Sequence, residues 1–94
     1  MINSGDLVAI FHSIHRVMKA EKRLKEQGLP ILLIPAPRVL AADCGLAIRY
    51  AEGDRVAVEE FLASEDLLPE EIFRKNDEQY VMVERRGIKG NEEN

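Results

Sequence analysis

Residues 6–34 decide the fold of this 94-residue chain, and they read DLVAIFHSIHRVMKAEKRLKEQGLPILLI. The stretch begins and ends with short apolar runs, Asp6 to Phe11 and Ile31 to Ile34, which are typical of buried strands. Between these runs, apolar residues recur at helical spacing from Ile14 to Gln27. Because only short links join the three elements, their order predicts a right-handed crossover between two parallel strands.

The residues that flank this helix support its limits. Ser13 precedes the helix, and its hydroxyl can accept a hydrogen bond from a backbone N–H of the first turn. Gly28 follows the helix and tolerates the left-handed conformation in which many helices end. Glu21 and Lys25 are four residues apart, so we expect them to form an ion pair on the exposed side.

The rest of the chain predicts one more helix and three more strands. The expected elements are a rigid turn at 35–38, a helical turn at 39–43, a strand at 46–50, a helix at 54–64 capped by Asp54, and strands at 72–75 and 79–84. Together with the first three elements, this order predicts an α+β, ferredoxin-like β-α-β-β-α-β sandwich with an additional C-terminal strand. Both helices are expected on one face of the sheet.

We predict a single domain at residues 1–86 and a flexible polar tail at 87–94, which reads GIKGNEEN. In a ferredoxin-like sheet the second strand lies at an edge, although residues 31–34 are apolar throughout. A second copy of the chain or the C-terminal strand would cover such an edge, so the sequence leaves a homodimer open.

The composition excludes several classes of protein. The chain is 46% hydrophobic and 32% charged, which excludes disorder of the main body, and its net charge of −4 argues against nucleic-acid binding. The apolar runs are too short to span a membrane, and no secretory signal opens the chain. A single cysteine excludes an internal disulfide and a zinc site built on paired cysteines. These features predict a cytoplasmic protein without a cofactor.

Cys44 is the strongest candidate for chemistry. It lies in the segment PAPRVLAADCGLA (35–47), where a loop meets a strand, and Gly45 after it allows a close approach. A nucleophilic thiol needs a positive local field. If the first two strands are parallel, their carboxyl ends meet at one end of the sheet. The loop with His12, Ser13 and His15 would then lie beside the loop with Arg38 and Cys44.

Each of these residues can also be explained by a purely structural role. A lone cysteine in a small domain is most often a buried apolar side chain, and Asp43 next to it opposes a thiolate. His12 and His15 are explained by surface placement or by backbone hydrogen bonds, and only a minor alternative joins them to Cys44 as metal ligands. Lysines and arginines on the first helix and the acidic pair Glu70-Glu71 fit solvated faces.

Several segments together resemble the selenium/sulfur carrier protein-like family, a family of small domains of unknown function. They are His12-Ser13, KAEK at 19–22, GLP at 28–30, IPAPR at 34–38 and CGLA at 44–47. The resemblance covers residues 6 to 52 best. It implies that Cys44 carries sulfur or selenium, with Gly45 and Arg38 as its motif neighbours. The chain lacks the Cys-Pro step of better understood small sulfur carriers.

Two functions follow, from different classes. The first is a carrier rather than an autonomous enzyme: a cysteine desulfurase would load Cys44, and an acceptor enzyme would unload it. The second is a non-catalytic interaction or dimerisation domain in which Cys44 is structural. The accessibility of the Cys44 thiol in the folded protein discriminates between them.

Overall fold

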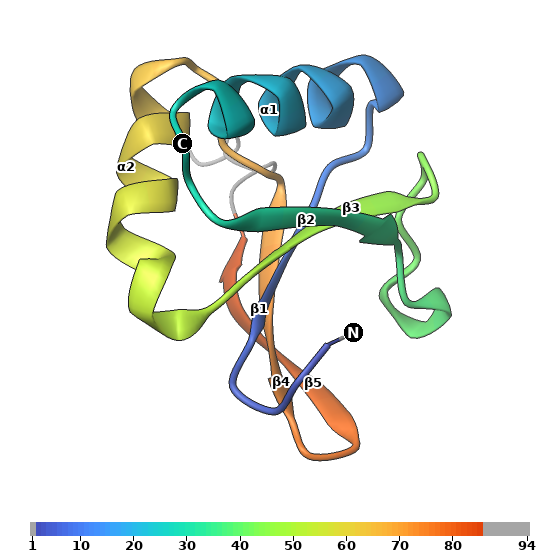
Figure 1. Ribbon diagram of the computed structural model, residues 1–94. Coiled ribbons are helices and arrows are strands. Elements are labelled where there is room, and N and C mark those ends of the chain that lie inside the picture. The colour runs from blue at the N-terminus through green and yellow to red at the C-terminus, as the bar shows by residue number, and fades with distance from the viewer. Residues whose placement is uncertain (1, 86–94) are drawn as a thin grey trace, which may run out of the picture.

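The computed structural model describes residues 2–85, which form one five-stranded sheet and two α-helices (Figure 1). The elements in chain order are β1 (Leu7–Ile10), α1 (Ile14–Glu26), β2 (Ile31–Pro35), the 3-10 helix η1 (Arg38–Leu40), β3 (Leu46–Tyr50), the 3-10 helix η2 (Glu52–Asp54), α2 (Arg55–Ser64), β4 (Glu71–Asn76) and β5 (Gln79–Arg85). The predicted boundary at residue 86 and the predicted tail at 87–94 lie outside the described residues.

The sheet has the order β2-β3-β1-β4-β5, and each pair of neighbours is antiparallel. The predicted α+β class is confirmed by two α-helices and a five-stranded antiparallel sheet. The first two strands are not neighbours in the sheet, because β3 lies between β1 and β2 and pairs with both. These two strands still run in the same direction, since each is antiparallel to β3.

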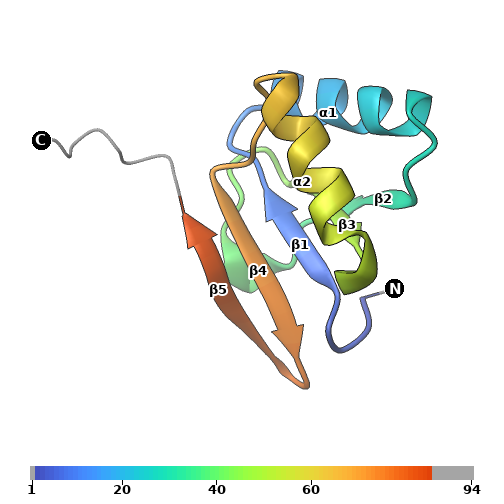
Figure 2. The same ribbon diagram turned by 90° about the vertical axis from the view of Figure 1, so that its left-hand side faces the viewer.

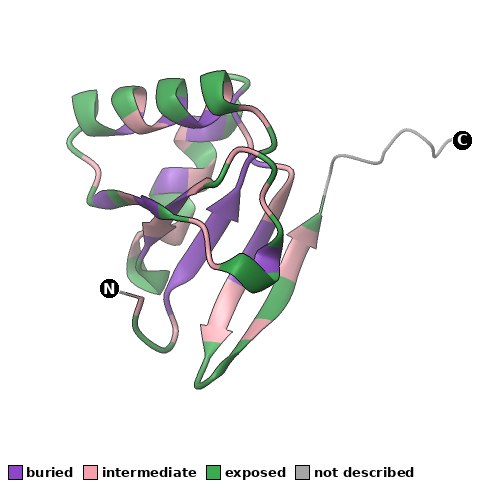
Figure 3. Ribbon diagram, turned by 90° about the vertical axis from the view of Figure 1, so that its right-hand side faces the viewer, coloured by how far each residue is buried: buried purple, intermediate pink, exposed green. Residues whose placement is uncertain are grey.

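The central strand β1 is buried along its whole length, as Figure 3 shows. Its alternate side chains enter two separate apolar clusters. Leu7 and Ala9 join the cluster beneath the helices, and Val8 and Ile10 join a smaller one on the other face. A strand covered on both faces is apolar throughout, which explains the continuous run in the sequence.

Both helices cover the same face of the sheet (Figure 2). Val17, Ala20 and Leu24 of α1 meet Val58 and Leu62 of α2 in the cluster beneath them. Helical spacing puts each of these sets on one side of its helix, so burial of the two apolar sides fixes both helices to the sheet. Within the described residues, no helix is long and apolar enough to cross a lipid bilayer.

The ends of the helices follow local rules only in part. The Ser13 hydroxyl accepts a hydrogen bond from the Arg16 N–H at 3.3 Å, and Gly28 has a φ of +75°, as the sequence predicts. Glu21 and Lys25 form the expected ion pair at 2.9 Å. Asp54 precedes α2, but its side chain makes no capping hydrogen bond, because η2 leads directly into the helix.

The two edges of the sheet are β2 and β5. The C-terminal strand therefore pairs with β4, at the side of the sheet opposite to β2. Of the two coverings considered for β2, the chain's own last strand is excluded. Within residues 2–85, the outer side of β2 is left without a neighbouring strand.

Candidate functional site

Cys44 lies on a tight turn that leads into β3. The Gly45 N–H donates to the carbonyl of Ala42 at 3.1 Å, which makes Asp43 and Cys44 the two central residues of the turn. The Gly45 carbonyl in turn accepts from the Ala36 N–H at 2.9 Å, so the turn is fixed to the chain after β2. Gly45 has a φ of +78°, and a Cβ placed there would find no atom within 4 Å. Open space therefore surrounds the Cβ position of Gly45, the residue after Cys44.

The Cys44 thiol is half-buried and packs against the cluster beneath the helices. Its Sγ lies 3.1 Å from the carbonyl oxygen of Phe11 and 3.3 Å from that of Leu46. Both partners are acceptors, so the thiol donates its single hydrogen to one of them at a time.

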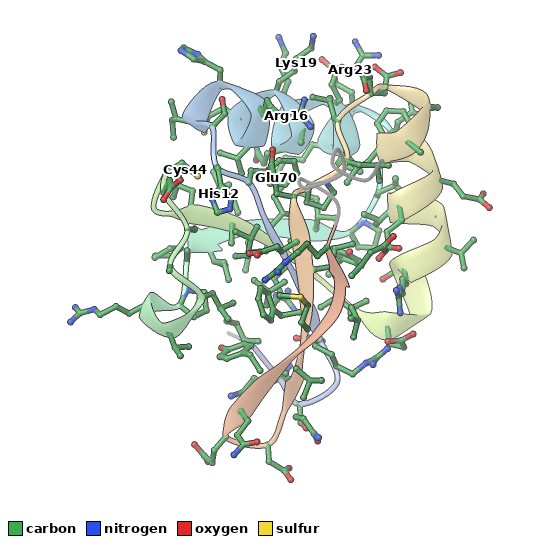
Figure 4. All side chains as sticks on the ribbon, turned by 180° about the vertical axis from the view of Figure 1, so that it is seen from behind. His12, Arg16, Lys19, Arg23, Cys44 and Glu70 are labelled. Atoms are coloured by element: carbon green, nitrogen blue, oxygen red, sulfur yellow. The ribbon has the colours of Figure 1, made fainter. Side chains whose placement is uncertain are left out.

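His12 lies beside this turn, at the carboxyl end of β1 (Figure 4). Its Nδ1 is 3.4 Å from the backbone N–H of Asp43 and 3.5 Å from the Asp43 carboxylate. With Nδ1 unprotonated the imidazole accepts from that N–H, and with Nδ1 protonated it donates to the carboxylate. The ring therefore has a partner in either protonation state, and both partners belong to the residue that precedes Cys44.

The amino-terminal end of α1 lies at the same end of the sheet. Ser13 caps the helix two residues after Phe11, whose carbonyl accepts from the Cys44 thiol. The sequence thus predicted the neighbourhood of the loops that carry His12, Ser13 and Cys44, because β1 and β2 run in the same direction. The positive end of the helix dipole and the turn share this end of the molecule.

Two predicted residues remain apart from the thiol. The exposed side chain of Arg38, at the start of η1, makes no hydrogen bond or ion pair with any residue of the described range; only its carbonyl accepts, from the Ala41 N–H. The exposed side chain of His15, on the first turn of α1, also has no such partner there. Across residues 2–85, no three side chains of the metal-ligand types are grouped to hold an ion, so His12, His15 and Cys44 do not form the metal site that was considered.

Two residues near the site were not predicted. The Glu70 carboxylate accepts from the backbone N–H of His12 at 3.2 Å, although the acidic pair at 70–71 was interpreted as solvated. The Arg16 guanidinium donates to the carbonyls of Asp66 and Leu68, at 3.3 and 2.7 Å. These hydrogen bonds join residues 50 to 58 positions apart in the chain, and no local pattern in the sequence predicts them. Figure 4 shows Glu70 and Arg16 at the same end of the molecule as His12.

Comparison with known proteins gives one match. No curated protein and no solved structure matches the chain. One family profile matches residues 6–74, a range that includes β1, the Cys44 turn and most of β4. The match therefore covers β1 to β3, both α-helices and every residue of the candidate site, and it ends before β5. The chain belongs to the family described as "Putative Se/S carrier protein-like".

Proposed function

We propose that the protein carries sulfur or selenium on Cys44, as a persulfide or as its selenium analogue. The observation that carries this proposal is the position of the half-buried thiol on a tight turn, with open space beside Gly45. A carrier must offer one sulfur to two partners in succession, and a turn at the end of a sheet is reached from outside more readily than the interior of the domain.

Loading is an exchange at sulfur between two thiols. The Cys44 sulfur attacks the terminal sulfur of a persulfide on the donor, such as a cysteine desulfurase. A new S–S bond forms at Cys44 while the bond between the donor's own cysteine and that terminal sulfur breaks. The donor leaves as a thiolate and takes up the proton that Cys44 releases, so no external oxidant or reductant is consumed.

The surroundings of Cys44 suit a step in which the thiol is first held and then released. Before loading, the hydrogen bonds to Phe11 and Leu46 keep the sulfur against the core. A persulfide extends the side chain by one atom and no longer has the thiol hydrogen on Sγ, so both carbonyl contacts lose their donor. The loaded side chain is therefore expected to turn outward, where an acceptor enzyme can reach the terminal atom.

The second candidate is an interaction domain with a structural cysteine. The same two hydrogen bonds favour it, because they satisfy the thiol within the fold. In that case Cys44 acts as a small apolar residue with a weak donor, and function lies on another surface.

The alkylation rate of Cys44 at several low urea concentrations separates the two functions. A carrier thiol is exposed by a local rotation, so its rate in the folded protein should be nearly independent of urea below the unfolding transition. A structural thiol reacts only after global unfolding, and its rate should then rise with urea as the unfolding equilibrium constant does. The second result would contradict the carrier proposal.

A further inference from the structure

The edge strand β2 has features that edge strands of monomeric proteins usually avoid. Its sequence is ILLIP, without a charged residue, and no bulge interrupts its pairing with β3. The strand at the other edge, β5, carries Glu84 and Arg85 and has a register shift opposite Ile72 and Phe73. Charges, bulges and prolines protect sheet edges from pairing with another chain; β2 has neither a charge nor a bulge, and its one proline, Pro35, is its last residue.

The pairing of β2 with β3 determines which backbone N–H groups of β2 point outward, away from β3. The Ala36 N–H bonds to the Gly45 carbonyl on the β3 side, and antiparallel ladders alternate from residue to residue. The N–H groups of Leu32 and Ile34 therefore also point to β3. Ile31 and Leu33 direct their N–H groups outward, and Pro35, the third residue of that set, has no N–H to offer.

Exposed apolar side chains of α1 lie next to the free edge of β2. Arg16 and Arg23 reach residues that follow α2, so their flank of α1 faces α2. Ile14 and Met18, one turn apart, lie on the opposite flank and are 43% and 44% exposed. Since α1 packs on β2 and β3 (Figure 1), the flank that faces away from α2 lies toward the free edge of β2. Leu32, 40% exposed, adds an apolar side chain on the other face.

We propose that a second copy of this chain pairs with β2, in antiparallel orientation and with the two-fold axis at Leu33. In this register Leu33 exchanges two hydrogen bonds with Leu33 of the other copy, and each Ile31 N–H donates to the opposite Pro35 carbonyl. The missing N–H of Pro35 leaves these four bonds intact. Leu32 then lies opposite Ile34 of the other copy, so that apolar side chains meet across the two-fold axis.

The charges on the facing flank of α1 permit this approach. Glu21 and Lys25 lie on the same side of the helix as Ile14 and Met18 and form their ion pair there. This ion pair adds no net charge to the flank, and the exposed Lys22, one turn after Met18, lies at its margin. A copy related by a two-fold axis presents the same flank to its counterpart, as in every isologous interface.

The dimer leaves both thiols free for exchange. By the register of β2 with β3, Cys44 lies four residue positions along the strand direction from the two-fold axis. At about 3.3 Å per residue, the two thiols are roughly 25 Å apart, at opposite ends of the joined sheet. The dimer therefore presents two independent carriers, and its existence does not depend on the function proposed for Cys44.

The test is the molar mass in solution by sedimentation equilibrium, for the full chain and three variants. The unmodified chain is expected at twice its 10.6 kDa. Leu32→Lys places two charges beside the axis and should raise the dimer dissociation constant about 100-fold. Val81→Lys is the matched control, because Val81 is a strand residue at the other edge with a similar exposure of 45%, and this variant should remain a dimer.

Met18→Lys provides an independent check on the exposed surface of α1, and it should weaken the dimer without touching the sheet. A chain that stays monomeric up to about 1 mM would overturn the proposal and leave the edge to a strand of another protein. A dimer that survives Leu32→Lys, or that Val81→Lys disrupts, would overturn it as well, because the contact would then lie elsewhere.

The register has its own test in a Cys44→Ser background. In a hydrogen-bonded antiparallel pair the two Cα atoms are about 5.5 Å apart, which a disulfide can bridge. Leu33→Cys should therefore give a disulfide-linked dimer under mild oxidation. Leu32→Cys is the control, because its nearest counterpart lies on the diagonal at about 7 Å or more. Crosslinking of the control in preference to Leu33→Cys would overturn the register.

Discussion

The Cys44 Sγ lies 3.1 Å from the carbonyl oxygen of Phe11, a residue 33 positions earlier in the chain. This contact joins the turn before β3 to the carboxyl end of β1. The thiol is thus both the reactive group of the proposed carrier and a donor that holds its own turn in place.

Removal of this donor should destabilise the fold. Cys44→Ala leaves the Phe11 and Leu46 carbonyls without their shared donor and opens a small cavity, so we expect a loss of about 1 kcal/mol in the free energy of unfolding. Cys44→Ser keeps a donor and should lose less. Urea denaturation of the two variants measures the difference. An alanine variant as stable as the unmodified protein would show that the thiol does not hold the turn.

Gly45 should be sensitive to substitution because of its backbone conformation. Gly45→Ala meets no neighbouring atom, but its φ of +78° is unfavourable for a side chain and should cost about 1–2 kcal/mol. Gly53→Ala is the control, since Gly53 is also uncrowded and lies outside the left-handed region. It should be neutral or slightly stabilising. Equal thermal stability of the two variants would contradict this explanation.

His12 should protect the backbone of the Cys44 turn. His12→Phe keeps a ring but removes the acceptor of the Asp43 N–H, and loss of about 1 kcal/mol corresponds to about five-fold faster exchange of that amide. His15→Phe, on the exposed first turn of α1, should leave the exchange unchanged. Hydrogen exchange followed by NMR measures both. The same acceleration in both variants would mean that the imidazole of His12 has no specific role.

Tyr50 should make the stability depend on alkaline pH. Burial and the hydrogen bond to Glu59 raise the pKa of Tyr50 far above its ordinary value of 10. Above about pH 10 the unfolded chain loses this proton while the folded chain keeps it, so stability falls by about 1.4 kcal/mol per pH unit.

Tyr50→Phe removes this titration and separates it from those of the lysines. Near neutral pH the variant should be less stable by about 1.5 kcal/mol, because the hydroxyl bonds to a charged carboxylate. Between about pH 9 and about pH 11 the difference in unfolding free energy between the two proteins should shrink by about 1.4 kcal/mol, because only the unmodified protein loses stability as Tyr50 ionises in its unfolded chain. A difference that stays constant over this range would contradict the assigned cause.

The sequence predicted the elements well where local rules decide them. The limits of α1 follow from Ser13 and Gly28, and the burial of β1 follows from its continuous apolar run. The meeting of His12 with the Cys44 turn was also predictable, because the direction of two strands fixes which loops share an end of the sheet. Each of these features depends on residues close together in the chain or on the order of the elements.

Other features depend on contacts that no local pattern encodes. The acceptors of the Cys44 thiol are main-chain carbonyls, which every residue possesses, so the sequence alone does not reveal them. Glu70 meets His12 only because β4 pairs with β1. The position of β5 beside β4 likewise results from the pairing of a hairpin, whereas the sequence left the covering of β2 open.

The central claim is tested most directly by the intact mass of the chain after reaction with a cysteine desulfurase and cysteine. The account predicts the addition of one sulfur atom to the unmodified protein and none to Cys44→Ser, and a reducing thiol should reverse it. A parallel mixture, with a free low-molecular-weight thiol in place of the chain, serves as the positive control for sulfur release. A chain that remains unmodified while that thiol takes up sulfur would contradict the account.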